Sequence, residues 1–289
     1  MIRVENVTYG YGEKPILKDI SFKEKEHGIT AVWGRNGAGK TTLMKLLAGH
    51  EKPNKGIVEI MGTAPYNRAE VVQDVCYMQE DHPFSAIWNV KDSLRFGQFY
   101  YSNWDMDMAN RLLKIFRLDE KKKISKLSKG MKSALQFIIG ISSNAKITIL
   151  DEPSNGLDAN MRKKMYKIIR ESQEQHPRLF LVSTHHIEEI QQICDSILVL
   201  HDKEVFIHEP IDEIRECGIW LVGDKNKIEK VTDGQYVLEA SELGSRLKVM
   251  VDVPFNEKWK EIASLHGLSI EKVKLQDYLL NKTEEAELG

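Results

Sequence analysis

The sequence predicts an α/β fold with a mostly parallel sheet at its core, an antiparallel β subdomain, a helical insertion and a small C-terminal α+β extension. A glycine-rich loop at residues 34–41 lies between a strand pattern and a helix pattern. From residue 147 onward, apolar strand patterns alternate with helical patterns, which is typical of a parallel sheet covered on both faces. Residues 85–143 show helical spacing without strand patterns, which indicates the insertion.

Short strand patterns separated by turns fill the first part of the chain. Alternating apolar residues predict strands at residues 2–9, 16–22, 29–33, 56–61 and 75–78. Pro53, Asn54 and Gly56 mark the turn that precedes the fourth of these strands. A helix-like stretch lies between the third strand and that turn.

The middle of the chain changes from strands to helices and back. Within the insertion, one helical face collects Met108, Leu112, Ile115 and Phe116. After the insertion, three continuous apolar runs follow, with helical spacing between them, at residues 147–150, 179–183 and 197–200. We expect these runs to be buried parallel strands.

The sequence patterns that are typical of phosphate binding end before residue 217, so we expect the chain to be divided into two parts. Residues 1–216 form the main domain, with the helical subdomain at about 85–143, and residues 217–289 form an accessory α+β region. In this second part the patterns predict strands at 219–222, 236–238 and 247–253, and helices around 259–265 and 275–279. The role of the accessory region stays open.

Bulk properties limit the possible partners. The 289 residues carry a net charge of −2, so the chain has no general attraction to nucleic acid, and we expect no nucleic-acid partner. Three cysteines give no disulfide framework. No signal peptide and no apolar run of ~20 residues is visible, so we expect a soluble, cytoplasmic protein that reaches a membrane only through a partner.

The loop after the third strand matches the phosphate-binding pattern G-x-x-x-x-G-K-[ST] and continues into a helix; its residues are Gly34, Arg35, Asn36, Gly37, Ala38, Gly39, Lys40, Thr41 and Thr42. Its glycines let backbone N–H groups turn toward phosphate oxygens, and the helix adds its positive end. We expect Lys40 to reach the β- and γ-phosphates and the Thr41 hydroxyl to bind Mg²⁺.

Side chains suited to phosphate chemistry follow three other predicted strands. One apolar strand ends in Asp151, placed to hold Mg²⁺, and Glu152, placed to orient or deprotonate the attacking water. Gln79 follows the fifth predicted strand, where its amide can contact Mg²⁺ or that water. His185 follows a later strand and can sense a γ-phosphate, and its neighbour His186 is a rival candidate.

A second anion site is expected in the helical insertion. Residues 127–131 precede a helix, and they place Ser128 and Gly130 beside its N-terminal end, which favours an anion. We do not expect this segment to reach the nucleotide held by its own chain. Two copies that meet head-to-tail across a two-fold axis bring it to the partner's nucleotide.

These motifs, in this order, resemble those of the ATP-binding cassette (ABC) ATPases, the motor subunits of ABC transporters. The resemblance covers residues 1 to about 215 and implies the P-loop NTPase fold of the ABC type. In that family's terms the chain carries a Walker A loop (34–42), a Q-loop glutamine (Gln79), a signature motif (127–131), a Walker B pair (Asp151 and Glu152), a D-loop (154–158) and a switch histidine (His185).

The resemblance also implies the role of each site residue. Tyr11 stacks on adenine, with Tyr9 as a weaker rival. Besides the Walker A loop, the residues that contact ATP include Ser128, Gly130 and Asp158. The metal-binding residues are Thr41, Gln79 and Asp151, and the catalytic residues are Glu152, His185 and Gln79.

The signature motif departs from the usual L-S-G-G-Q of the family. Lys129 replaces the first glycine and Met131 replaces the glutamine, while Ser128 and Gly130, which face the γ-phosphate, remain. Bacterial export cassettes of the peptide- and antibiotic-resistance type carry a similar Gly-Met pair. We therefore expect a competent site, and slow turnover is the alternative.

Two weaker features lie near the insertion. In the family, the region after Gln79 forms a groove for a coupling helix of the membrane subunit; here it contains Phe84, Ile87, Trp88, Phe96, Phe99, Tyr100, Tyr101 and Trp104. The alternative is that these rings are core residues of the helical subdomain. A basic stretch, with Lys121, Lys122, Lys123, Lys126, Lys129 and Lys132, is either a solvated face or a contact for anionic lipid headgroups.

The leading hypothesis is the ATP-hydrolysing subunit of an ABC transporter, one that exports a peptide, toxin or drug through a separate transmembrane permease. Two cassettes, identical or paralogous, sandwich ATP and Mg²⁺, and the permease holds the cassette at the inner face of the cell membrane. The alternatives are a soluble ABC ATPase without a transport role, and a nucleotide-gated regulatory module with low hydrolysis.

Overall fold

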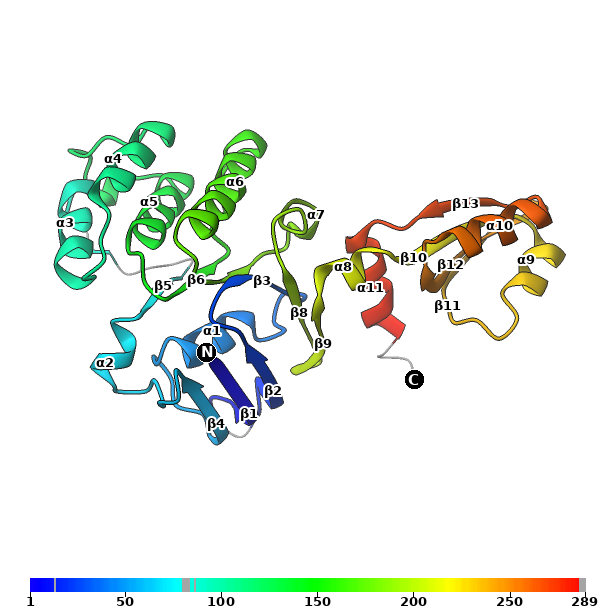
Figure 1. The fold of residues 1–289 in the computed structure, drawn as a ribbon, viewed down its shortest axis with the longest axis horizontal. Helices are drawn as coiled ribbons and strands as arrows, with labels where there is room; N and C mark the ends of the chain where they lie inside the picture. Colours follow the sequence, from blue (N-terminus) through cyan, green and yellow to red (C-terminus); the bar gives the residue numbers. More distant parts are fainter. Residues whose placement is uncertain (13, 80–83, 86, 286–289) are drawn as a thin grey trace. The chain divides into compact units, whose positions relative to one another are not determined.

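The computed structural model describes residues 1–12, 14–79, 84, 85 and 87–285 (Figure 1). The chain divides into two compact units, Met1–His208 and Glu209–Gly289. The sequence patterns predict this boundary slightly later, between residues 216 and 217. Among the described residues, no helix is long and apolar enough to cross a membrane.

A three-stranded antiparallel sheet forms one layer of the first unit, in the order β2-β1-β4. Its strands are β1 (Ile2–Tyr9), β2 (Leu17–Glu24) and β4 (Lys55–Ile60). In β1, Val4 pairs with Phe22 on one side and Val58 on the other, and all three are buried. This face is apolar because alternate residues of each strand point toward the core.

The second layer is a six-stranded sheet in the order β5-β6-β7-β3-β8-β9. Its strands are β3 (Gly28–Trp33), β5 (Val75–Met78), β6 (Ile147–Asp151), β7 (Leu179–Ser183), β8 (Ser196–His201) and β9 (Glu204–Pro210). The pairs β5–β6, β6–β7, β7–β3 and β3–β8 are all parallel. This confirms the mostly parallel core that the sequence predicted.

Helix α1 (Lys40–Leu47) shares one apolar core with both sheets. Leu43, Met44, Leu46 and Leu47 are all at most 1% exposed, so the helix buries a wide apolar face, while Thr41 stays exposed. Three further helices connect the strands of this unit: α2 (Ala69–Val72), α6 (Ala159–Gln175) and α7 (Ile187–Ile190).

The helical insertion lies between β5 and β6 and forms the upper-left part of Figure 1. It contains α3 (Val90–Tyr100), α4 (Met106–Ile115), the short 3₁₀ helix η1 (Ile124–Lys126) and α5 (Lys129–Ser142). Asn89 and Asp92 form a reciprocal capping box at the start of α3. Helix α5 is buried from Ser133 to Ser142 and is the central helix of this subdomain.

The second unit alternates strands and helices as β-α-β-β-α-β. Its strands are β10 (Cys217–Asp224), β11 (Val237–Leu243), β12 (Arg246–Pro254) and β13 (Ser269–Lys272), in the antiparallel order β11-β12-β10-β13. This topology is that of the ferredoxin-like fold. The helices are α8 (Ile211–Arg215), α9 (Lys225–Val231), α10 (Glu257–His266) and α11 (Leu275–Glu285).

Buried Arg178 connects the insertion to the start of β7. Its side chain is 4% exposed, and its Nη2 donates to the Ile141 carbonyl at 2.9 Å and to Ser172 Oγ at 3.0 Å. Nη1 donates to Asn144 Oδ1. Burial lowers the pKa of the guanidinium to about 10. Arg178 therefore satisfies carbonyl groups at the C-terminal end of α5, where a cation also meets the negative end of the helix dipole.

We predict that Arg178→Ala lowers the free energy of unfolding by about 3 kcal/mol, because the acceptors that it pairs lose their partner inside the protein. The control is Arg3→Ala, which removes an exposed ion pair with Glu5 (2.6 Å) and is expected to change stability far less, because solvent screens exposed charges. Urea denaturation measures both. Equal losses in the two variants would show that Arg178 has no special structural role.

Candidate active site

The sheet register brings four predicted motifs to one edge. Strands β5, β6, β7 and β3 are neighbours and run parallel, so the segments after them leave the sheet at the same edge. Asp151 on β6 pairs with Ser183 on β7, and Ser183 pairs with Val32 on β3, just before the glycine-rich loop. Ligand sites of α/β proteins form at this carboxyl edge.

The glycine-rich loop closes tightly onto the start of α1. Gly39 is the N-cap of the helix with φ +98°, a left-handed conformation that glycine adopts without strain. A Cβ at Gly34 would lie 2.5 Å from the Leu200 carbonyl oxygen, so this position has no room for a side chain. The loop can therefore turn its backbone N–H groups toward a phosphate.

Lys40 is held inside this loop. It is 8% exposed, and its Nζ donates to the carbonyl oxygens of Gly34 (2.6 Å) and Arg35 (3.3 Å). Burial lowers the pKa of Lys40, and the charges of Glu152 and Asp151 oppose that shift. An ammonium group among carbonyl groups and carboxylates is placed to bind phosphate oxygens.

Asp151 joins the loop to the sheet. The Thr41 hydroxyl donates to Asp151 Oδ2 at 2.7 Å, and the Ser183 hydroxyl donates to Oδ1. Asp151 is 2% exposed, so both carboxylate oxygens are satisfied within the protein. A hydroxyl and a carboxylate in contact are hard oxygen ligands of the kind that Mg²⁺ prefers, so the residues present fit that ion.

Glu152 and His185 form a pair directly beyond Asp151. Glu152 adopts a left-handed backbone (φ +49°), which is costly for a residue with a side chain and is typical of functional sites. Its N–H donates to the carbonyl oxygen (3.2 Å) and Oγ (2.9 Å) of Ser183, which holds this conformation. His185 Nδ1 lies 2.8 Å from Glu152 Oε2. The ring of His186 packs 3.9 Å from that of His185, and burial lowers the pKa of His186. The contact with the carboxylate is made by His185.

Gln79 and Tyr11 lie at different places in this unit. Gln79 directly follows β5, where Met78 pairs with Leu150, one residue before Asp151. Tyr11 is 61% exposed and its hydroxyl contacts Glu51 at 3.3 Å, whereas Tyr9 is 5% exposed within the core. An exposed ring can stack on a base, and a buried one cannot, so the geometry favours Tyr11.

The signature motif packs against the D-loop. Ser128 caps α5, and its Oγ accepts the Met131 N–H at 3.3 Å. A Cβ at Gly130 would lie 2.3 Å from the carbonyl oxygen of Gly156, so the two backbones are in direct contact. Ser133 Oγ donates to the Asn155 carbonyl at 2.7 Å and secures the same contact. The N-terminus of α5 and the D-loop therefore form one continuous surface.

Asp158 is the last residue of the D-loop and the N-cap of the following helix. Its side chain accepts the Met161 N–H at 2.9 Å and caps α6. Arg162 on α6 pairs with both carboxylate oxygens of Glu189 on α7 and donates to the Leu157 carbonyl at 3.2 Å. The sequence analysis missed this link between the D-loop and the segment after His185, because neither residue belongs to a recognisable pattern.

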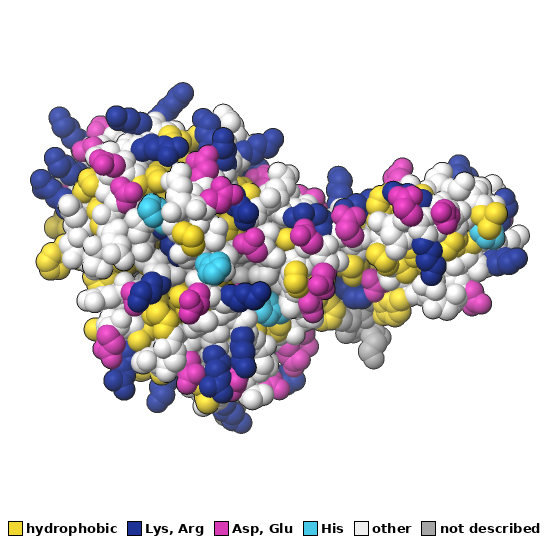
Figure 2. Space-filling model, viewed as in Figure 1, with side chains coloured by type: hydrophobic (Ala, Val, Ile, Leu, Met, Phe, Trp, Pro, Cys, Tyr) yellow, Lys and Arg dark blue, Asp and Glu magenta, His cyan; other side chains and the backbone are white. Residues whose placement is uncertain are grey.

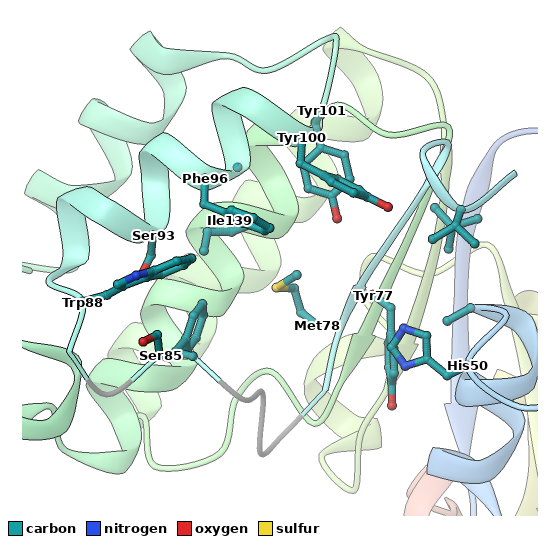
Figure 3. Close-up of a pocket in the computed structure, with 15 residues that line it drawn as sticks. His50, Tyr77, Met78, Ser85, Trp88, Ser93, Phe96, Tyr100, Tyr101 and Ile139 are labelled. Carbon is teal, nitrogen blue, oxygen red and sulfur yellow. The ribbon is translucent and has the colours of Figure 1, made fainter. Parts of the chain in front are cut away.

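An apolar cavity of about 350 Å³ lies between the parallel sheet and α3. Figure 3 shows rings from both sides pointing into it, among them Tyr77 from β5 and Trp88, Phe96 and Tyr100 from the insertion. Burial raises the pKa of the Tyr77 hydroxyl. The aromatic residues named in the sequence are thus divided: some line this cavity, and Phe99 is fully outside it, 88% exposed.

A phosphate loop between β3 and α1, with paired carboxylates at the end of a nearby parallel strand, defines a P-loop nucleotide-binding ATPase. The comparisons with known proteins agree. The family model described as ABC transporter matches residues 17–155. The uncharacterized ABC transporter ATP-binding protein MJ1023 of Methanocaldococcus jannaschii is 33% identical over 218 residues, which are 74% of this chain and 79% of that protein.

Two further matches point the same way. The bacitracin transport ATP-binding protein BcrA of Bacillus licheniformis is 28% identical over 219 residues, 75% of this chain and 72% of BcrA. A solved ATP-binding subunit of an ABC transporter is similar with a TM-score of 0.67 and 26% identity, over 74% of this chain and 92% of that one. The chain belongs to the ABC transporter ATP-binding family, and it is an ATPase of that class.

We predict that Ser183→Ala lowers the rate of ATP hydrolysis about tenfold or more, because it removes the hydroxyl that orients Asp151 and supports the Glu152 backbone. The control is Ser196→Ala on β8, whose hydroxyl pairs with Thr30 at 2.9 Å, away from the loop. The ATP turnover rates of the two purified variants test this prediction. Wild-type turnover in Ser183→Ala would exclude a positioning role.

Proposed function

We propose that this chain powers export of a peptide, toxin or antibiotic-like compound through a separate transmembrane permease. The observation that supports the proposal is the contact of Thr41 with Asp151, directly beside the Glu152–His185 pair, because the proposed nucleotide-binding and catalytic groups lie together there. The name of BcrA, a bacitracin transport protein, supports a cargo of this type. The Gly-Met pair at residues 130 and 131 supports the same direction of transport.

In this proposal each residue of the site has one task. Lys40 offsets the negative charge of the β- and γ-phosphate oxygens, and backbone N–H groups of residues 34–42 hold them. Glu152 accepts the proton of the attacking water, and His185 fixes the orientation of that carboxylate. Thr41, Asp151 and Gln79 hold Mg²⁺, which supplies neutralisation of phosphate charge when bound. Tyr11 stacks on adenine.

A second cassette completes the site. Ser128 and Gly130 lie at the free N-terminal end of α5, and a helix N-terminus favours an anion. We propose that they contact the γ-phosphate held by a partner cassette, identical or paralogous, with Asp158 and the rest of the D-loop beside them. The direct backbone contact between Gly130 and Gly156 supports this, because it joins the signature motif and the D-loop into one surface.

The apolar cavity is the proposed dock for the permease. Its rings come from β5 and from the insertion on either side of Gln79, so a segment that binds there contacts elements next to the metal site. Burial of aromatic side chains supplies much of the binding energy in protein interfaces. Through this contact the cassette is held at the inner face of the cell membrane.

We predict that Lys40→Ala abolishes ATP hydrolysis and weakens ATP binding, because the phosphates then face only backbone donors. Lys45→Ala, on the same helix, is the matched control and keeps near wild-type activity. Turnover and nucleotide titration measure the two effects. Near wild-type turnover of Lys40→Ala would show that this loop is not the active site.

Glu152→Gln should trap ATP between two chains. The amide keeps the size of the side chain but accepts no proton, so hydrolysis slows while binding survives, and bound ATP drives association by mass action. Light scattering should detect a dimer with ATP, and Ser128→Arg added to this variant should dissolve it. Glu174→Gln, an exposed change on α6, is the control.

A Glu152→Gln variant that stays monomeric at saturating ATP would contradict a sandwich formed by two cassettes alone. Repeating the measurement with the permease present then decides whether closure depends on that subunit. Co-purification with a membrane protein tests the transport role itself.

A further inference from the structure

Helix α3 exposes a stripe of two cations and one large ring. Lys91, Arg95 and Phe99 follow each other at intervals of four residues, so they lie on one face of the helix. All three are exposed, and Phe99 is 88% exposed. The opposite face buries Val90 and Leu94 in the insertion. A phenylalanine that is exposed next to basic residues contributes nothing to the core of the subdomain.

The basic end of this stripe continues onto the loop after α4. The Val90 N–H donates to the Lys122 carbonyl at 3.1 Å, and the Lys91 N–H donates to the Glu120 carbonyl at 3.0 Å. Lys91 also borders one shallow hollow together with Lys114, Arg117, Lys121, Asp119 and Glu120. Figure 2 shows Lys and Arg side chains gathered in the upper-left region, where Figure 1 places α3 and α4.

None of these cations forms an ion pair with the described residues, although Asp119 and Glu120 border the same hollow. Within the part of the chain that the structure describes, neither Lys91 nor Arg95 has a carboxylate oxygen within 4.0 Å, and the same holds for Lys114, Arg117 and Lys121. The whole chain carries a net charge of −2, so this concentration of positive charge is local. A local basic surface attracts an anionic partner at short range.

We infer that this basic–aromatic stripe (Lys91, Arg95 and Phe99, continued by Lys121) binds the headgroup layer of an anionic phospholipid membrane. Cations pair with headgroup phosphates, and a ring exposed beside them enters the boundary between headgroups and acyl chains. Phe99 argues against a contact made by charge alone, because a ring that enters the headgroup boundary adds apolar attraction.

The position of the stripe fits such a contact. Phe96, the residue next to Arg95, lines the apolar cavity that we propose as the permease dock. The inference therefore rests on the proposed function, since a permease bound at that cavity brings the neighbouring face of α3 toward the bilayer. It goes further, because it gives the cassette a lipid contact of its own, independent of the permease.

Vesicle sedimentation of the purified full-length chain, without permease, tests the inference. We expect binding to vesicles of equal parts phosphatidylglycerol and phosphatidylcholine, weakened by salt, and little binding to phosphatidylcholine alone. Lys91→Gln with Arg95→Gln should lower the partition coefficient about fivefold for each cation removed. The matched control is Lys230→Gln with Lys258→Gln, which removes the same charge from exposed sites in the second unit.

Phe99→Ser tests the ring separately. It should lower the partition coefficient several-fold, while Leu265→Ser, at a position that is 82% exposed on α10, leaves it unchanged. Absence of binding to anionic vesicles would overturn the inference, and so would equal losses in the test and control variants. Loss through the cations but not through Phe99 would also overturn it, in favour of an acidic macromolecule.

The basal ATPase rate without vesicles should be the same in all of these variants. Failure of the lipid contact and failure of the transport role are distinguishable, because vesicle binding is measured without the permease. Co-purification with the permease reports on the transport role alone.

Discussion

The hydroxyl of Thr41 donates to Asp151 between two segments that are 110 residues apart in the chain. This contact exists because β3 and β6 both pair with β7, in a register that sets Ser183 opposite Asp151 and Val32. Ser183 then completes the shell of Asp151 and holds the left-handed backbone of Glu152. The nucleotide loop, the proposed metal ligands and the proposed general base thus depend on one sheet register.

Further contacts in the first unit connect this site to the signature motif and to α7. The D-loop begins just after Glu152, and its Gly156 touches Gly130 of the signature motif without room for a Cβ. Arg162 joins the D-loop to α7 through Glu189, and α7 follows His185. The Glu152–His185 pair is therefore linked through packed backbone to the surface that we propose meets a second cassette. Such contacts transmit motion because packed interiors deform little.

Sequence patterns predicted those parts whose chemistry is local. Strands at 2–9, 75–78 and 179–183 were predicted with the observed ends, and the loop and its carboxylates carry motifs that are complete within a few residues. The patterns did not predict elements whose formation depends on pairing or packing with distant parts of the chain. The missed elements include α2, α8, α9, β9 and β13; β13 is a short edge strand with one apolar residue, Ile270, and α9 buries only Ile228.

The site shows the same division. Asp151, Glu152 and His185 were predicted from their places after apolar strands, but Ser183 was not, because a serine at a strand end becomes informative only when the register is known. The contact between Gly130 and Gly156 likewise depends on how α5 docks against the D-loop.

The most direct test of the account is a double-mutant cycle on Mg²⁺-dependent ATP affinity with Thr41→Val and Asp151→Asn. The account predicts strong coupling, at least about 1 kcal/mol, since both groups serve one metal site. Additive effects would contradict it.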